Sequence, residues 1–382
     1  MLCIRNGLVF DAVHENPEKK DLLINQGKIV KLGENLKIPA DCEIVDAEGM
    51  HVYPGFVDAH SHLGTIGSSI GFEGDDVNEM TDILTPHLRG IDCIEPMDIA
   101  FSEAKEGGVT TVCVGPGSAN VVGGTFAVIK TEGKRVDNMI IRERVAMKCA
   151  FGENPKRCYR DKNNFSRMST AAKLRELLFK TQEYDAKLKA AGDDATKKPA
   201  FDFKLESMLP VIRREIPLKA HAHRADDIFT ALRIAKEFDV RITLEHVTDG
   251  SLITEELAKE NVMLAVGPSF GARTKFELKN KSFKTPGDLA NAGCHVSIIT
   301  DAPVIPQQYL RLCAGLAVKE GMKEFDALKA ITIHAAEHAG VADRVGSLEE
   351  GKDADIVIMN GCLFESQSDV IATYIDGKKV FG

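Results

Sequence analysis

The sequence predicts an α/β fold in which a barrel of parallel strands fills the middle of the chain and both ends form one small β domain. Between about residues 55 and 345, β-prone apolar runs alternate with helical patterns, which is typical of parallel α/β folds. Short β-prone runs broken by turn residues fill residues 1–54 and 346–382. A doubly wound open sheet is the alternative, but no GxGxxG motif follows the first strand, which weakens its dinucleotide-binding form.

The two ends of the chain share one pattern. In residues 1–54, turn pairs such as Asn6-Gly7 and Gln26-Gly27 separate the β-prone runs, which predicts a meander of antiparallel strands. The C-terminal segment repeats this pattern, with runs at 356–359, 370–375 and 379–381. Neither segment alone has enough apolar surface for a stable core. We therefore expect residues 1–54 and 346–382 to pair into one composite β-sandwich domain.

The segment 55–345 carries the expected barrel. Its strands are predicted at 56–59, 110–114, 145–150, 218–221, 242–246, 263–266 and 296–300, and its helices at 96–107, 225–238, 254–261 and 325–339. Residues 154–217 depart from the alternation, with two helical patterns at about 169–191 and 202–214 joined by the polar linker AAGDDATKKP. We expect a solvated helical insertion there. A lid over the site is the functional alternative, because long loops after barrel strands often close over active sites.

Composition excludes several classes of partner. The chain of 382 residues has 44% apolar content, a net charge of −9 and a pI near 5.7, so it offers no electrostatic attraction for nucleic acid or an anionic membrane. No apolar run approaches the roughly 18 residues that span a bilayer, and no secretory signal opens the sequence, so we expect a cytoplasmic protein. Nine scattered cysteines without a CxxC pair predict reduced thiols.

A metal-site pattern occupies the first predicted barrel strand. Residues 51–63 read HVYPGFVDAHSHL, and on a strand His60 and His62 point to the same face. Three more polar residues end later strands: His221 ends LKAH, His246 ends ITLEH and Asp301 ends VSIITD. In a parallel barrel these ends converge on one site. Imidazole and carboxylate ligands without cysteine favour a catalytic centre for Zn²⁺, Fe²⁺ or Mn²⁺.

These motifs also carry a family resemblance. The stretches GFVDAHSHL, GGVTT and IITDAP, the two strand-end histidines and the closing GSLEEGKDADIVI resemble the amidohydrolase superfamily of metal-dependent hydrolases, and most closely its imidazolonepropionase- and prolidase-like branch. The resemblance covers essentially the whole chain. It implies a (β/α)₈ TIM barrel with a small β-sandwich built from both termini.

The resemblance also implies roles for the strand-end residues. His60 and His62 would be ligands from the first strand, His221 and His246 ligands from the fifth and sixth, and Asp301 the eighth-strand residue that contacts the metal and takes the proton from bound water. The physical chemistry agrees, because a divalent cation brings the pKa of its water to about 7 and a nearby carboxylate can accept the proton. His246 could also stabilise the oxyanion.

The fourth strand leaves two candidates in VAMKCAFGENPKR. Lys148 lies within an apolar run, where an unpaired ammonium is costly, and carboxylation into a bridging metal ligand would explain its presence. Glu153 lies nearer the end of the strand, where a metal would sit, and for that reason we favour it. The choice leaves the number of ions open between one and two.

Other polar residues near these positions have weaker predictions. His223 and Arg224 follow the fifth-strand ligand in HAHRADD, and we expect both to contact substrate; His223 could instead be a ligand or structural. The glycine-rich run 115–124 is expected to form a tight loop after a strand. His334 and His338 lie four apart, as metal ligands on a helix do, but without the Glu of HExxH we place them on a helix surface.

Together these patterns predict an enzyme. We expect a metal-dependent amidohydrolase that cleaves an amide or cyclic amide C–N bond of a small molecule by attack of metal-bound hydroxide. Hydrolytic deamination of a heterocycle is the alternative, although no HxxE follows the fifth-strand histidine. A catalytically silent scaffold or subunit is a third reading, but all five principal ligand positions are filled. The expected partners are a small-molecule substrate and, from the family, further copies of the chain in a homo-oligomer.

Overall fold

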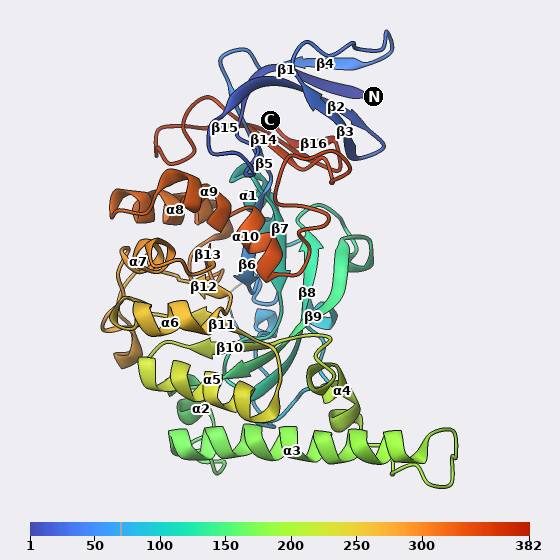
Figure 1. Cartoon of the computed structure of the whole chain (residues 1–382), viewed down its shortest axis with the longest axis vertical. Helices are drawn as coiled ribbons and strands as arrows, with labels where there is room; N and C mark the ends of the chain where they lie inside the picture. Colours follow the sequence, from blue (N-terminus) through green and yellow to red (C-terminus); the bar gives the residue numbers. More distant parts are fainter. Residues whose placement is uncertain (69–70) are drawn as a thin grey trace.

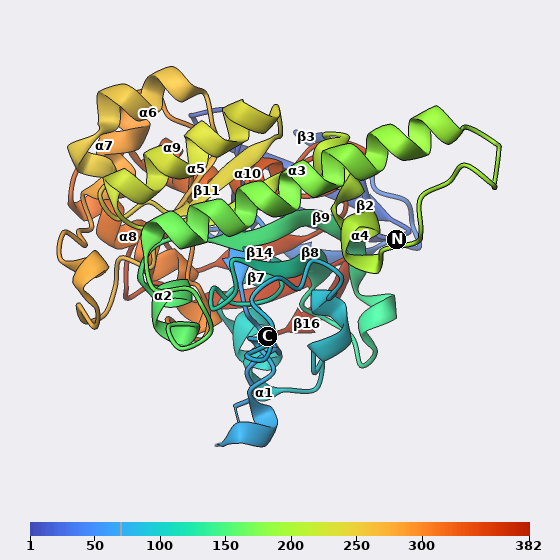
Figure 2. The same cartoon turned by 90° about the horizontal axis from the view of Figure 1, so that it is seen from below.

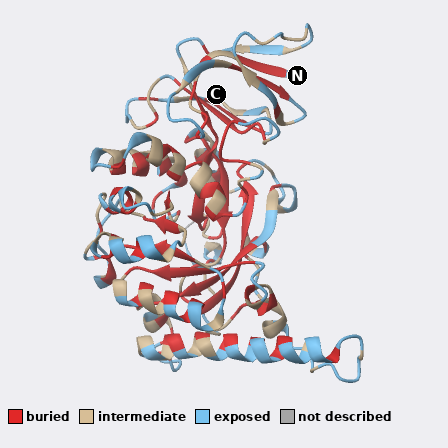
Figure 3. Cartoon of the chain, viewed as in Figure 1, coloured by how far each residue is buried: buried red, intermediate tan, exposed pale blue. Residues whose placement is uncertain are grey.

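The computed structural model describes residues 1–68 and 71–382, and its strands form two eight-stranded sheets within those ranges. Figure 1 shows the sheet made from both ends of the chain at the top and the barrel below it. Most strands are buried, whereas the outward sides of the surrounding helices are exposed (Figure 3). No helix within the described ranges is long and apolar enough to span a membrane.

The terminal sheet joins the two ends of the chain, as the sequence predicts. Its strand order is β16-β15-β14-β5-β1-β2-β3, with β4 beside β1. It is mixed and not a purely antiparallel meander, because β4 and β5 run parallel to β1. Its strands are β1 (Leu2–Val9), β2 (Glu18–Asn25), β3 (Lys28–Gly33), β4 (Glu43–Asp46), β5 (His51–Pro54), β14 (Ile356–Met359), β15 (Val370–Ile375) and β16 (Lys378–Phe381). The exact domain boundaries at 54 and 346 stay a prediction.

The barrel confirms the predicted fold class with one difference. Its strands follow one another in chain order, and β13 meets β6, so the barrel is nearly closed. One strand was not predicted: β8 runs antiparallel to both β7 and β9, because glycines at its start made that stretch resemble a loop. The strands are β6 (Phe56–Ser61), β7 (Val109–Val114), β8 (Val122–Lys130), β9 (Ile140–Ala150), β10 (Leu218–Ala222), β11 (Ile242–His246), β12 (Leu264–Val266) and β13 (Val296–Ile298).

Helices cover the outside of the barrel (Figure 1). The predicted helix 325–339 is two helices in the structure, because Thr332 leaves helical geometry at φ −136° and ψ −101°. In α5, the apolar side chains face β10 and β11, while the charged ones other than the buried Asp227 face solvent. The helices of the barrel are α1 (Ile99–Glu106), α5 (Ala225–Phe238), α6 (Thr254–Glu260), α7 (Thr285–Asn291), α8 (Leu310–Lys319), α9 (Glu324–Ala330) and α10 (Ile333–His338).

The segment 154–217 contains α3 (Arg167–Ala191) and α4 (Phe203–Ile212), close to the predicted helices, preceded by α2 (Glu153–Cys158). Ser166 begins α3 with a capping box. Figure 2 shows α3 lying along the outside of the barrel, where it packs on α4 and α5.

A buried ion-pair network joins the barrel to the terminal sheet. Lys130, at the end of β8, donates to Asp355 at 2.6 Å, and its Nζ lies 3.0 Å from Asp353. Asp353 also pairs with Arg344 and Lys28. Burial alone would raise the pKa of Asp353, but these three cations outweigh burial and lower it to about 2.

The depressed pKa of Asp353 predicts a pH dependence of stability. A carboxyl whose pKa is lower in the folded than in the unfolded state stabilises the fold above its unfolded pKa of about 4, and this contribution disappears as the pH falls to about 2. The shift corresponds to about 2 kcal/mol. We expect Asp353→Asn to reduce the free energy of unfolding at pH 6 and to differ less from the native protein at pH 3, as measured by urea unfolding. A constant difference at both pH values would contradict this assignment.

Candidate metal centre

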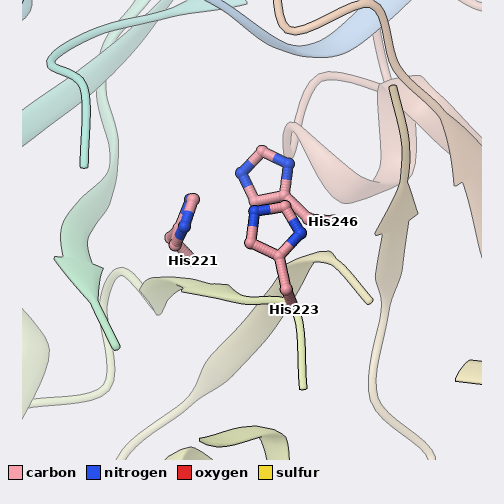
Figure 4. Close-up of side chains that lie close together, drawn as sticks. All are labelled: His221, His223 and His246. Carbon is pink, nitrogen blue, oxygen red and sulfur yellow. The ribbon is translucent and has the colours of Figure 1, made fainter. Parts of the chain in front are cut away.

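The structure gathers the predicted strand-end residues into two neighbouring groups at one end of the barrel. Within each group, one candidate ligand atom per residue lies within 4.8 Å of the others. The first group is His60, His62 and Asp301. The second is His221, His223 and His246, which Figure 4 shows with their rings converging.

In the first group, both histidines direct the same ring nitrogen to Asp301. The Nδ1 of His60 donates to Glu245 Oε2 at 2.9 Å, and the Nδ1 of His62 donates to the Gly115 carbonyl at 2.7 Å. These bonds leave Nε2 as the lone-pair nitrogen of each ring. The two Nε2 atoms lie 3.6 and 3.2 Å from Asp301 Oδ1. Three ligand atoms therefore face one point.

In the second group, hydrogen bonds orient two rings and leave nitrogens free. His246 Nδ1 donates to the Gly267 carbonyl at 2.8 Å, and His223 Nδ1 bonds Thr248 Oγ1 at 2.7 Å. Among the residues that the structure describes, His246 Nε2 and both nitrogens of His221 are buried without a hydrogen-bond partner. Buried polar atoms are rarely left unsatisfied. A metal ion fits this group, since it would bind His246 Nε2 and one of the two free nitrogens of His221.

Two of the predicted site residues have an uncommon backbone conformation, with a positive φ angle. His246 and Asp301 have φ values of +76° and +54°, where side chains other than glycine are uncommon. His246 is the last residue of the buried strand β11, and Asp301 lies three residues after the end of the buried strand β13. Such conformations persist where surrounding contacts hold them, and they often occur at functional sites.

Burial sets the protonation states that metal ligands need. It lowers the pKa of His60, His221 and His223 well below the ordinary value, and that of His246 to about 4. For Asp301, burial acts to raise the pKa, but the neighbouring histidines, led by His246, lower it well below the usual range. At neutral pH the histidines are neutral and Asp301 is ionised, which are the forms that bind metals.

Of the two fourth-strand candidates, the structure brings Lys148 to the histidines. Its Nζ lies 3.1 Å from His60 Nε2 inside the barrel, and burial lowers its pKa to about 8 against the attraction of nearby carboxylates. Glu153, which the sequence favours, begins α2 and belongs to neither group of candidate ligands. Its backbone N–H donates to Glu277 Oε2 at 2.9 Å.

The sequence profile of the Amidohydrolase family matches residues 51–380. The chain belongs to the amidohydrolase family. As an amidohydrolase it is similar to a solved structure of an amidohydrolase from Thermotoga maritima MSB8, with 42% identity, a TM-score of 0.96 and complete coverage of both chains. A solved Xaa-Pro dipeptidase with bound methionine shares the fold, with 14% identity, complete coverage of both chains and a TM-score of 0.60.

A curated relative is longer than this amidohydrolase. The chain is 28% identical to amidohydrolase tasK of Hapsidospora irregularis over 390 residues, which cover 94% of this chain and 40% of tasK. The chain thus spans less than half the length of that relative.

The amidohydrolase holds two buried carboxylates at this site that the sequence analysis did not identify. Glu245 accepts hydrogen bonds from His60 and from His338 at 2.9 Å, and it forms an ion pair with Lys219 at 2.8 Å. Glu277 lies in the loop after β12, with Oε1 3.7 Å from His223 Nε2. Glu245 could have been found, since a charged residue inside the apolar run ITLEH needs a buried partner. Glu277 lies in a loop without such a pattern.

Several predicted positions differ in the structure. His338 is buried and bonds Glu245, so its placement on a helix surface was wrong. His334 packs against His295, just before the start of β13, with 4.2 Å between ring centroids and the rings tilted by 35°. Arg224, a predicted substrate contact, forms two hydrogen bonds with the neighbouring Asp226, at 2.9 and 2.8 Å.

The candidate centre of the amidohydrolase opens into a cavity of about 370 Å³. His62, His221, His223 and Asp301 form part of its wall, and the loop at 268–281 forms much of the rest. Within the described ranges, the insertion 154–217 contributes Asn154 to this wall, while α3 and α4 contribute no residue. The lid hypothesis for the two long helices therefore gains no support from the cavity.

Proposed function

We propose that this amidohydrolase is a metal-dependent hydrolase that cleaves an amide or cyclic amide C–N bond of a small molecule. The observation that carries the proposal is the convergence of five buried histidines and Asp301 in two groups of potential ligands. Neutral imidazoles and an ionised carboxylate form a donor set suited to Zn²⁺, with Fe²⁺ or Mn²⁺ as alternatives.

We place up to two ions in this centre. His60, His62 and Asp301 would hold one, and His221, His223 and His246 would hold the other. Lys148 supports a pair of ions, because its Nζ lies 3.1 Å from His60 Nε2 and the His60 ring lies 5.2 Å, between centroids, from that of His246 in the second group. In its carboxylated form Lys148 would supply oxygen ligands between the two groups, and we favour it over Glu153 for this role.

In the proposed reaction, the bound ion and the side chains of the protein have different roles. A bound divalent ion would lower the pKa of water to about 7 and polarise the scissile carbonyl. With Oδ1 beside both first-strand histidines, the second oxygen of the Asp301 carboxylate would accept the proton from the attacking water. The same carboxyl can then give this proton to the leaving nitrogen. His223, whose ring is held by Thr248, orients the second group.

Metal analysis tests the proposal. We expect protein purified without chelator to contain about one to two equivalents of Zn, Fe or Mn, and the His60→Ala His62→Ala variant to lose at least one of them. The His14→Ala His87→Ala variant is the control, because these histidines lie outside the candidate centre. Absence of a transition metal in the native protein, even after reconstitution, would contradict a metal-dependent hydrolase.

A further inference from the structure

A buried lysine without a carboxylate partner lies in the wall of the cavity. Lys281 belongs to the loop between β12 and α7, and the residue is only 8% exposed. Its Nζ donates to the backbone carbonyls of Phe270 at 3.0 Å and Ala272 at 3.4 Å. An ammonium has three N–H donors, so one remains after these two bonds.

The other buried ammonium groups around the barrel are neutralised. Lys219 pairs with Glu245 at 2.8 Å, Lys275 with Glu277 at 3.0 Å and Lys130 with Asp355 at 2.6 Å. Lys148 stands within the candidate metal centre itself. Among the described residues, no carboxylate lies within 4.0 Å of Lys281 Nζ, although burying an unpaired charge is costly.

The surroundings of Lys281 add positive charge. Arg273, on the same loop, donates to the carbonyl of Lys281 at 2.8 Å, and its guanidinium is close enough to act on the ammonium. Burial, followed by Arg273, lowers the pKa of Lys281. The nearby carboxylate of Asp301 is directed to the histidines of the first group. The cavity wall therefore presents a cation that an anionic ligand would neutralise.

We propose that Lys281 binds a carboxylate of the substrate, so that the enzyme acts on amides that carry a free carboxylate, such as N-acyl amino acids. The proposal rests on the proposed hydrolase function, and it names the substrate class. A carboxylate would accept the remaining N–H of Lys281 in a charge-assisted hydrogen bond. The scissile amide would then lie between Lys281 and the candidate metal centre, which line the same cavity.

A matched pair of probes isolates the carboxylate. N-acetyl amino acids and the corresponding N-acetyl amino acid amides differ in one charged group. Calorimetry on the metal-loaded Asp301→Asn variant, in which the loss of the proton acceptor slows turnover, measures the binding of both probes. We expect the acids to bind about 10- to 100-fold more tightly than the amides. We expect Lys281→Met to remove this preference and Lys281→Arg to retain part of it.

Lys279→Met is the matched control, because Lys279 lies on the same loop but is exposed, with its Nζ 4.9 Å from the Phe276 ring centroid. Lys281 also donates hydrogen bonds to two loop carbonyls, and Lys281→Met loses these bonds. If that variant does not fold, Lys281→Gln replaces it, because glutamine removes the charge but keeps an N–H donor. Equal binding of acids and amides, no binding of either, or an unchanged preference in a folded Lys281 variant would overturn the proposal. Equal hydrolysis of acids and amides would overturn the role of Lys281 but leave the hydrolase function intact. Carboxylate-selective binding without hydrolysis would instead contradict the hydrolase function.

Discussion

Replacing Asp301 with asparagine is expected to lower kcat by about 10²- to 10⁴-fold, the usual contribution of general acid–base catalysis. The change keeps the size of the side chain and one oxygen, but it removes the negative charge that faces His60 and His62 at 3.6 and 3.2 Å. Asparagine tolerates positive φ, so the backbone at this position, with φ of +54°, can be kept.

The measurement is the pH dependence of kcat for the metal-loaded Asp301→Asn variant with an amide substrate, together with its metal content. The exposed Asp343, changed to asparagine, is the control. A residual rate that no longer depends on an acidic ionisation would support the role of Asp301 as the proton acceptor. A variant that retains its metal and a kcat within threefold of the native enzyme would refute that role.

Replacing Glu245 with leucine is expected to reduce the free energy of unfolding by about 3–5 kcal/mol, the range found when one partner of a buried ion pair is removed. Glu245 is fully buried, accepts hydrogen bonds from His60, His338 and Thr243, and forms an ion pair with Lys219. Without the carboxylate, the ammonium of Lys219 would remain in the barrel with no negative partner. Urea unfolding of the native and variant proteins measures the loss.

A double replacement separates charge from packing. We expect Glu245→Leu combined with Lys219→Met to be less destabilised than the sum of the two single variants, because the double variant buries neither charge. Glu255→Leu, on the exposed surface of α6, is the control for loss of a carboxylate. A loss below 1 kcal/mol for Glu245→Leu would show that this network does not stabilise the barrel.

Continuous burial explains why most barrel strands could be predicted. Strands such as β7 and β10 are buried along their whole length, so their sequences VTTVCV and LKAHA are rich in apolar and β-branched residues. β8 is equally buried, but Gly123 and Gly124 lie at its start. The register of its pairing with β9 shifts there, between Val122 and Gly124. A glycine pair at a bulge resembles a loop when only the sequence is known.

The candidate ligands could be predicted because barrel topology brings strand ends together. On the fourth strand, however, nearness to the strand end did not identify the residue that lies beside the histidines. Lys148 alternates with the outward-facing Met147 and Cys149 and so points into the barrel, whereas by Glu153 the chain has already turned into α2. Lys281 comes from an irregular loop, where no periodicity indicates which way a side chain points.

The pairing of β5 with β14 constrains when the protein can fold during its synthesis. The pair joins His51 to Met359, about 300 residues further along the chain, and Gly55, which leads from β5 into β6, donates to the Asp355 carbonyl at 2.8 Å. The strand that carries His60 is thus anchored by segments that leave the ribosome much later. Until then, β5 has an open edge available to other chains. In nascent amidohydrolase this edge of β5 therefore stays without its native partner through most of translation.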